Sequence, residues 1–200
     1  INQACPAQVE SHILNFVSRD AMDIKGLGEK NIAALIEKGF LHTIVDIFRL
    51  KEHREELIAQ GVVGKEKNTD KLLAAIEEAK KNEPQRLLTG LGIPGIGKAA
   101  AAALMQHFKT LEALENASDE AILAVRDMGE TSVAAIRSYF QNEGNAKICR
   151  ELQQLGVATA AQERTAQGDE LADMSFVVTG TLRHFGRREI TELIEQHGGR

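Results

Sequence analysis

Three short glycine-containing motifs, each followed by a helical pattern, constrain the fold of this chain more than any other feature. They read Ile24-Lys25-Gly26-Leu27-Gly28, Ile93-Pro94-Gly95-Ile96-Gly97 and Val125-Arg126-Asp127-Met128-Gly129. Small or apolar residues at i, i+3 and i+4 after each motif predict helices over residues 29–38, 98–108 and 130–140. Glycine tolerates positive φ and lets the backbone approach another molecule closely, so we interpret each motif as a tight hairpin between two helices.

The spacing of these motifs predicts a tandem repeat. The last two are 32 residues apart, and the same step back from Gly95 reaches Val63 in the string Val62-Val63-Gly64-Lys65, which precedes a helical pattern over residues 68–81. We interpret this string as a degenerate copy and number the four copies, in chain order, as the first to fourth hairpins. Four tandem helix-hairpin-helix units are therefore predicted within residues 20–156, where a further helical pattern covers 142–155.

The composition favours a helical protein without a membrane span. Hydrophobic residues make up 43% and aromatic residues only 4% of 200 residues, and no apolar run reaches the length of about 18 that a transmembrane helix needs. Two cysteines, Cys5 and Cys149, are too few for a disulfide framework, so we expect a reducing, cytoplasmic setting and a monomer. Because the chain begins at Ile1 without a signal-peptide pattern and stops inside an unfinished element, we expect a fragment of a longer protein.

The last part of the chain differs in pattern from the repeat. Residues 157–173 are small and polar without periodicity, which is typical of a linker. The apolar run Met174–Gly180 then predicts a buried strand, and residues 186–197 an amphipathic helix. The predicted fold is therefore mainly α, followed by the start of a truncated α/β domain over residues 174–200.

The hairpins predict an anion site. Unpaired amides and the helix dipole both favour negative charge at a helix N-terminus, and a DNA phosphate fits such a site. Nearby lysines would add charge, and binding through phosphates would be independent of base sequence and sensitive to salt. The predicted DNA-binding residues are Lys25, Gly26, Leu27, Gly28, Lys30, Lys65, Lys67, Gly95, Ile96, Gly97, Lys98, Met128 and Gly129. The alternative is a set of αα-hairpins with glycine turns and no ligand, but repetition in phase favours DNA.

The distribution of charge supports this choice. The net charge of −5 argues against a nucleic-acid partner when it is taken alone. However, residues 86–111 hold three basic residues and no acidic one, whereas residues 112–130 hold six acidic residues and one arginine. The basic residues thus gather around the third hairpin.

Other site patterns are absent or accidental. The string Gly92–Lys98 has the spacing of a nucleotide P-loop, but Ala99 stands where the motif needs Ser or Thr, and no strand precedes it. The sequence shows no nucleophile elbow, carboxylate pair or metal cluster. Taken alone, Cys5 is most simply an inert thiol and Cys149 a buried core residue.

Several strings together are highly specific. They are Cys5-Pro6-Ala7-Gln8, Phe16 to Met22 before the first hairpin, Leu72 to Glu77, Leu91 to Gly97, and Phe176 to Leu182 with Arg188-Glu189. In this order they resemble the C-terminal half of a bacterial NAD-dependent DNA ligase, over all 200 residues. The resemblance divides the chain into the end of a zinc module with a connecting helix (1–19), the helix-hairpin-helix domain (20–156), the linker (157–173) and the start of a BRCT domain (174–200).

The resemblance also implies roles for single residues. Cys5 would be the fourth ligand of a zinc ion, with three cysteines upstream. Thr179 and Gly180 would occupy the position at which some BRCT domains bind phosphate. The glycine amides would contact DNA across the minor groove, in a clamp around nicked duplex, at Gly26, Gly28, Gly95, Gly97 and Gly129.

The parent protein would seal nicks in replication and repair through an adenylated lysine, using NAD and magnesium. The family's Lys-x-Asp-Gly motif does not occur in this sequence, so we expect this chain alone neither to react with NAD nor to ligate. The competing interpretations are a stand-alone, non-catalytic adaptor with helix-hairpin-helix and BRCT domains, and a structural αα-repeat that binds proteins.

Two hairpins depart from the family pattern. Val63 and Lys65 replace the two glycines of the second hairpin, whose amides we expect to bind phosphate less well unless Lys65 and Lys67 compensate. Asp127 replaces the first glycine of the fourth hairpin, and a carboxylate beside phosphate is unfavourable. We therefore expect the fourth hairpin to contribute less than the first and third.

Overall fold

The computed structural model describes residues 6–161, 171, 174–178, 190–191, 193–194 and 197. It divides into two compact units, Ile1–Ala161 and Gln162–Arg200. The described residues form no β-strand, and their one isolated bridge joins Thr110 to Ala160. The prediction of a mainly helical protein is confirmed, and no helix in the described part is long and apolar enough to cross a membrane.

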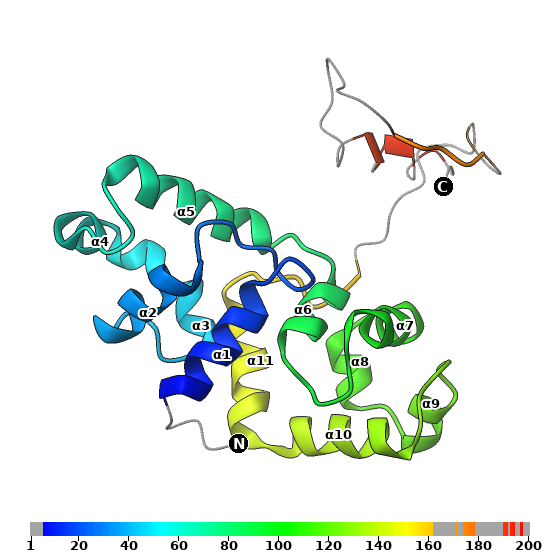
Figure 1. Ribbon diagram of the computed structural model, residues 1–200. Helices are drawn as coiled ribbons and strands as arrows, with labels where there is room; N and C mark the ends of the chain where they lie inside the picture. Colours follow the sequence, from blue (N-terminus) through cyan, green and yellow to red (C-terminus); the bar gives the residue numbers. More distant parts are fainter. Residues whose placement is uncertain are drawn as a thin grey trace. The chain divides into compact units, whose positions relative to one another are not determined.

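The first unit is an array of short helices (Figure 1). In chain order they are α1 (Pro6–Val17), α2 (Glu29–Glu37), α3 (Ile44–Ile47), the 3-10 helix η1 (Leu50–His53), α4 (Arg54–Gln60), α5 (Glu66–Ala79), α6 (Pro84–Gly90), α7 (Lys98–Phe108), α8 (Leu111–Glu115), α9 (Asp119–Leu123), α10 (Glu130–Gln141) and α11 (Glu143–Gln154). In Figure 1, α1 and α11 lie in the middle, with α2, α4 and α5 on one side and α7 to α10 on the other.

One hydrophobic core runs through this unit. The apolar face of α5 buries Leu72, Leu73 and Ile76, as its period of 3.6 residues predicts. Near the middle of the unit, the rings of Phe16 on α1 and Phe48 after α3 meet edge to face, with 6.0 Å between their centroids. The longer helices therefore lie where their apolar periodicity placed them, with ends that differ by a residue or two.

Two kinds of helix N-terminus occur in this unit. Helices α3, α8, α9 and α11 begin after a residue whose side chain accepts a hydrogen bond from a first-turn amide. These capping residues are Thr43, Thr110, Ser118 and Asn142. The helices that follow the four hairpins have no such side-chain bond, and their N-cap residues are Gly28, Lys65, Gly97 and Gly129. The hairpin helices thus leave backbone donors open.

The compact unit extends beyond the predicted start of the linker. The amide of Ala158 donates to the carbonyl of Lys80 at 2.9 Å, the carbonyl of Thr159 accepts from Leu111 at 2.9 Å, and the amide of Ala161 donates to Lys109 at 2.7 Å. Residues 157–161 therefore close onto the ends of α5 and α7 instead of beginning a linker. Such contacts connect backbone groups far apart in sequence, so side-chain periodicity carries no signal of them.

The second unit departs from the expected strand. Residues 174–178 have no regular secondary structure, whereas residues 190, 191, 193 and 194 are helical, as predicted. A strand forms only when its backbone groups pair with a neighbouring strand, and the described residues supply none. The strand predicted for this run is therefore wrong over residues 174–178. Cys5, Thr179 and Gly180 lie outside the described residues.

Candidate functional site

The first, third and fourth hairpins share one backbone geometry. The third of their five residues has positive φ: +99° at Gly26, +77° at Gly95 and +62° at Asp127. The fifth residue is extended and is the N-cap of the following helix, as at Gly97, with φ −88° and ψ −170°. Asp127 thus adopts the conformation that glycine adopts in the other two, which aspartate tolerates better than most residues.

A turn hydrogen bond closes each of these three hairpins. The amide of the fourth residue donates to the carbonyl of the first, at 3.5 Å from Leu27 to Ile24 and 3.0 Å from Ile96 to Ile93. Leu27 and Ile96 are only 3% and 4% exposed. These two predicted site residues therefore anchor the hairpin in the core and offer little surface to a ligand. Met128 is partly buried at the same position.

The N-terminus of α7 shows the resulting donor set. Its first helical bond runs from the amide of Ala101 to the carbonyl of Gly97 at 2.8 Å. The amides of Lys98, Ala99 and Ala100 precede that bond, and Gly97 has no side chain to accept from them. Helices α2 and α10 start in the same way, with Ile32 bonded to Gly28 and Val133 to Gly129. Free amides together with the positive end of the helix dipole form a site for an oxyanion.

The N-cap glycines are not required by the fold. A Cβ atom built on Gly28, Gly97 or Gly129 would meet no other heavy atom within 4 Å. Their extended backbone also suits any residue, as Lys65 shows at the equivalent position of the second hairpin, with φ −80° and ψ 176°. What glycine provides at these positions is room for another molecule to approach the amides. By contrast, the positive φ of Gly95 favours glycine at that position.

The predicted lysines lie at the surface. Lys25, Lys30, Lys65 and Lys67 are exposed, and in the part of the chain that the structure describes they form no ion pair. Lys98 differs, because its Nζ lies 3.4 Å from Oδ1 of Asp20, with both side chains 72% exposed. Such an exposed pair is weak and is readily exchanged for another anion.

The second hairpin has a different turn. Its positive φ values fall on Gly61 (+61°) and Gly64 (+109°), and Val63 is buried. The amide of Asn68 donates to the carbonyl of Lys65 at 2.9 Å, so the third amide of α5 is already used. A Cβ on Gly64 would lie 2.8 Å from Nδ2 of Asn68, which fills the space beside this turn. The departure expected from the sequence is therefore a change in turn geometry as well as a loss of glycine.

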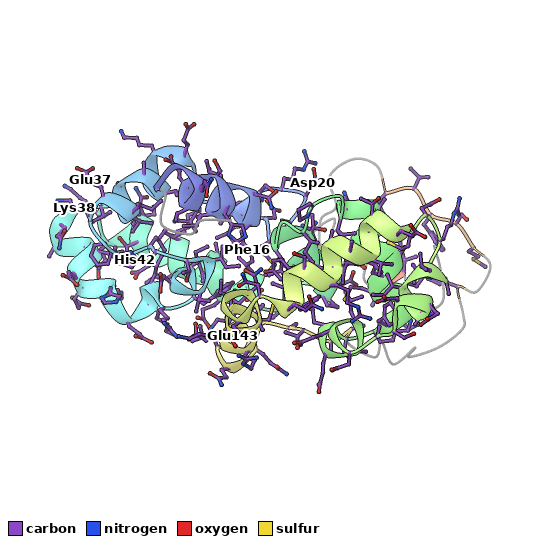
Figure 2. All side chains as sticks on the ribbon, turned by 90° about the horizontal axis from the view of Figure 1, so that it is seen from below. Phe16, Asp20, Glu37, Lys38, His42 and Glu143 are labelled. Carbon is purple, nitrogen blue, oxygen red and sulfur yellow. The ribbon has the colours of Figure 1, made fainter. Side chains whose placement is uncertain are left out.

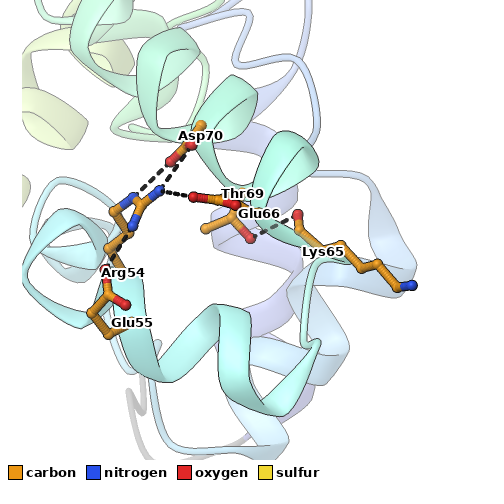
Figure 3. Close-up of polar contacts among 6 residues, drawn as sticks. All are labelled: Arg54, Glu55, Lys65, Glu66, Thr69 and Asp70. Carbon is orange, nitrogen blue, oxygen red and sulfur yellow. Dashed lines mark hydrogen bonds and ion pairs between the residues drawn. The ribbon is translucent and has the colours of Figure 1, made fainter.

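An ion-pair cluster holds the two helices of the second hairpin together (Figure 3). Arg54 on α4 donates from Nε and Nη2 to the two oxygens of Asp70 on α5, at 2.7 and 2.9 Å. It also contacts Glu55 at 2.6 Å and Glu66 at 3.1 Å, while the ammonium of Lys65 points away. The hydrogen bonds from Arg54 lower the pKa of Asp70. No sequence signal marks this pair, because 16 residues and a turn separate its members.

The fourth hairpin is more acidic than the third. Glu130 lies in the first turn of α10, whereas the first turn of α7 has no acidic residue. The carboxylate of Asp127 pairs with the adjacent Arg126 at 3.5 Å, and both side chains are exposed. The backbone amide of Glu120 and the hydroxyl of Ser118 lower the pKa of Glu120, which lies on the helix before this hairpin, so its carboxylate is ionised at neutral pH. The third hairpin is therefore the most favourable for an anion.

Elsewhere in the described residues the structure offers little for catalysis. No group of three or more His, Cys, Asp or Glu side chains comes together there. Burial raises the pKa of Cys149 to about 12, which makes its thiol a poor nucleophile. A groove of about 1360 Å³ lies between α1, the third hairpin, α10 and α11, and no Asp, Glu, Lys or Arg lines it.

Known proteins are similar to this chain in sequence. The family described as "Helix-hairpin-helix motif" matches residues 86–149, which include the third and fourth hairpins. The chain is similar over its whole length to "DNA ligase" of Thermotoga neapolitana (40% identical, 28% of that protein), Symbiobacterium thermophilum (38%, 30%) and Bacillus subtilis (40%, 30%). It thus spans about three tenths of the length of these relatives. Over all its 200 residues, the chain is therefore similar to a part of these DNA ligases.

Proposed function

We propose that this chain binds duplex DNA through its phosphates, as the DNA-holding region of an NAD-dependent ligase that seals nicks. The observation that carries the proposal is the open N-terminus of α7, where Gly97 leaves three amides uncapped and unobstructed. The same arrangement at Gly28 and Gly129 repeats the site. Similarity to the DNA ligases supplies the substrate class.

The chemistry of these sites predicts the mode of binding. Backbone amides donate to phosphate oxygens, which are the same in every nucleotide, so binding is independent of base sequence. In this proposal the first and third hairpins contribute most, the fourth less because of Asp127, and the second acts through the charges of Lys65 and Lys67. Four units arranged in this way would hold one duplex on successive phosphates.

The proposal for the parent enzyme follows the family resemblance. Zinc would be held by Cys5 with upstream cysteines, and residues 174–200 would begin a BRCT domain with Thr179 and Gly180 at a phosphate position. NAD and magnesium would serve adenylation by a lysine outside this chain, which contains no Lys-x-Asp-Gly string. The isolated chain should therefore take up no label from radioactive NAD, and labelling would contradict this assignment.

The experiment measures the affinity of the 200-residue chain for a fluorescent nicked duplex at about 50 mM and about 200 mM salt. We expect binding that weakens with salt and does not change when the base sequence is scrambled. The variant Gly97→Val should lower the affinity about tenfold without lowering Tm, because its side chain would stand between the amides and the phosphate.

The control variant for this experiment is Ala113→Val, which adds an exposed branched side chain on α8, outside the hairpin motifs. It should leave the affinity unchanged. Absence of binding at low salt would exclude DNA as the partner. An unchanged affinity in folded Gly97→Val would exclude contact through the α7 amides.

A further inference from the structure

Residues around α6 bind the backbone around α1 along a continuous line. We call this contact the α1–α6 seam and define it by Asn82, Arg86 and residues 89–91 on one side, and by His12, Asn15 and residues 19–22 on the other. The two segments run antiparallel, so Asn82 faces the end of the second segment and Leu91 faces its beginning.

At one end of the seam, two side chains hold the turn after α1. Asn82, only 5% exposed, donates from Nδ2 to the carbonyl of Met22 at 2.8 Å. Arg86 donates from Nη1 to the carbonyls of Ala21 and Arg19, at 2.6 and 3.1 Å. Because the acceptors are main-chain atoms, these bonds fix the path of the backbone itself.

At the other end, α1 holds the C-terminus of α6. Nδ2 of Asn15 donates to the carbonyl of Gly90 at 3.3 Å, and Nε2 of His12 lies 3.2 Å from the carbonyl of Leu91. A Cβ on Gly90 would lie 2.9 Å from the ring of Phe16, so the helices approach too closely for any larger residue. In Figure 2, Phe16 lies inside the unit and Asp20 at its surface.

Each side of the seam leads directly into a hairpin. Met22 is two residues before the first hairpin, and Leu91 is two residues before the third. A contact between Asp20, within the held turn, and Lys98, the first residue of α7, adds to the seam from the third hairpin. The seam therefore connects the first hairpin to the third. These are the two hairpins with glycine at both the third and the fifth position of the motif.

From this placement we infer that the seam holds the first and third hairpins at a fixed spacing, so that both hairpins bind one duplex at the same time. Arg86 and Asn82 are positioning residues for DNA binding. The inference rests on the proposed function. Two sites held at the spacing of their ligand bind far more tightly than two that move independently, because the second contact then forms within one complex.

The test is a double-mutant cycle with Arg86→Met and Gly97→Val on the 200-residue chain, measured with the nicked duplex. Arg86→Met alone should lower the affinity about tenfold, but less than about threefold in the Gly97→Val background, because the third hairpin is then already lost. A direct phosphate contact by Arg86 would instead give the same loss in both backgrounds, and that result would overturn the inference.

Two further variants separate positioning from charge. Asn82→Ala changes an uncharged, buried side chain, and should lower the affinity several-fold and flatten the salt dependence while the chain stays folded by circular dichroism. If it does not fold, Asn15→Ala replaces it, since this exposed residue also holds the seam. Lys81→Met is the matched control for Arg86→Met, because Lys81 pairs with Glu78 and lies outside the seam.

The outcomes distinguish the two proposals. If Gly97→Val leaves the affinity of the otherwise unchanged chain intact, the proposed function fails. If Gly97→Val weakens binding but the folded seam variants do not, or if Lys81→Met weakens binding as much as Arg86→Met, the inference fails and the proposed function stands.

Discussion

The second and third hairpins follow the same spacing in the sequence, but they differ in how accessible the backbone amides of the next helix are. Both precede long helices, α5 and α7, and neither helix has a side-chain cap. In the third hairpin, positive φ falls on Gly95 and the N-cap glycine stands in open space, whereas in the second it falls on Gly64 beside Asn68. A repeat in phase therefore preserves a turn between helices, but it does not by itself preserve an anion site.

The two hairpins are also held in different ways. The helices of the second are joined to each other by Arg54 and Asp70, within the unit. The third hairpin is joined through α6 to residues 19–22, which precede the first hairpin, by Arg86 and its neighbours. The helices of the second hairpin are thus joined to each other by an ion pair, while the first and third hairpins are joined to each other through the α1–α6 seam. This difference suggests that the first and third hairpins bind jointly, whereas the second contributes through charge alone.

The largest expected effect comes from replacing the N-cap glycines that follow the first and third hairpins, Gly28 and Gly97. The double variant Gly28→Val and Gly97→Val should lower the affinity for nicked duplex about a hundredfold, or about 2.7 kcal/mol. Both backbones are extended, so Tm should not change. Fluorescence anisotropy with parallel thermal melts checks this, and a loss no larger than that of Gly97→Val alone would contradict shared binding.

Conversion of the second hairpin to the glycine pattern would test the comparison in the opposite direction. The triple variant Val63→Gly, Gly64→Ile and Lys65→Gly should raise the affinity up to about tenfold, because it opens the amides of α5 despite the loss of one charge. Titration at two salt concentrations measures the gain. A weaker affinity would mean that Lys65 binds by charge and that turn geometry matters little.

The two glycines of the third hairpin should differ in stability when replaced by alanine. Gly95→Ala places a Cβ at φ +77° and should lower the free energy of unfolding by about 1–2 kcal/mol. Gly97→Ala should change it by less than about 0.5 kcal/mol, because its backbone is extended. Urea unfolding of both variants checks this, and equal losses would show that the fold needs both glycines.

The seam should make stability depend on pH through His12. Burial lowers the pKa of His12, so the folded state favours the neutral ring. Its contribution is therefore complete above the unfolded value of about 6.5 and is lost as the pH falls through the lower folded value. Between about pH 7.5 and about pH 5, Tm should fall more in the parent chain than in His12→Gln, which keeps a donor to Leu91. An equal fall of Tm with pH in the parent chain and in His12→Gln would contradict this role of His12.

The smallest expected effect concerns the ion pair between Arg54 and Asp70 in the second hairpin. Arg54→Met should lower Tm slightly near neutral pH and leave DNA affinity unchanged, because Arg54 holds α4 to α5 on an exposed surface. Arg54 lowers the pKa of Asp70, so this contribution is present above the unfolded value of about 3.9 and disappears as the pH falls below it. A marked loss of DNA affinity would show that binding by the second hairpin depends on the packing of α4 against α5 and not only on the charges of Lys65 and Lys67.

Prediction from sequence succeeded where the signal is local. The helices after the hairpins follow from a period of 3.6 residues, and Gly95 follows from the need for positive φ. The seam could not be predicted, because Arg86 and Asn82 bind carbonyls 65 and 60 positions away, and any residue presents such a carbonyl. For the same reason, the sequence of residues 157–161 predicts a linker although their backbone bonds to Lys80, Lys109 and Leu111.

By itself, the sequence determined the helical class, the phase of the hairpins and the glycines that open the amides, because each depends on the conformational preferences of a few adjacent residues. Only the tertiary structure decided that Gly64 and not Val63 carries the positive φ, that Lys98 faces Asp20, and that α1 and α6 are joined. These outcomes depend on which surfaces meet when the chain packs, and packing brings together residues that no local pattern connects.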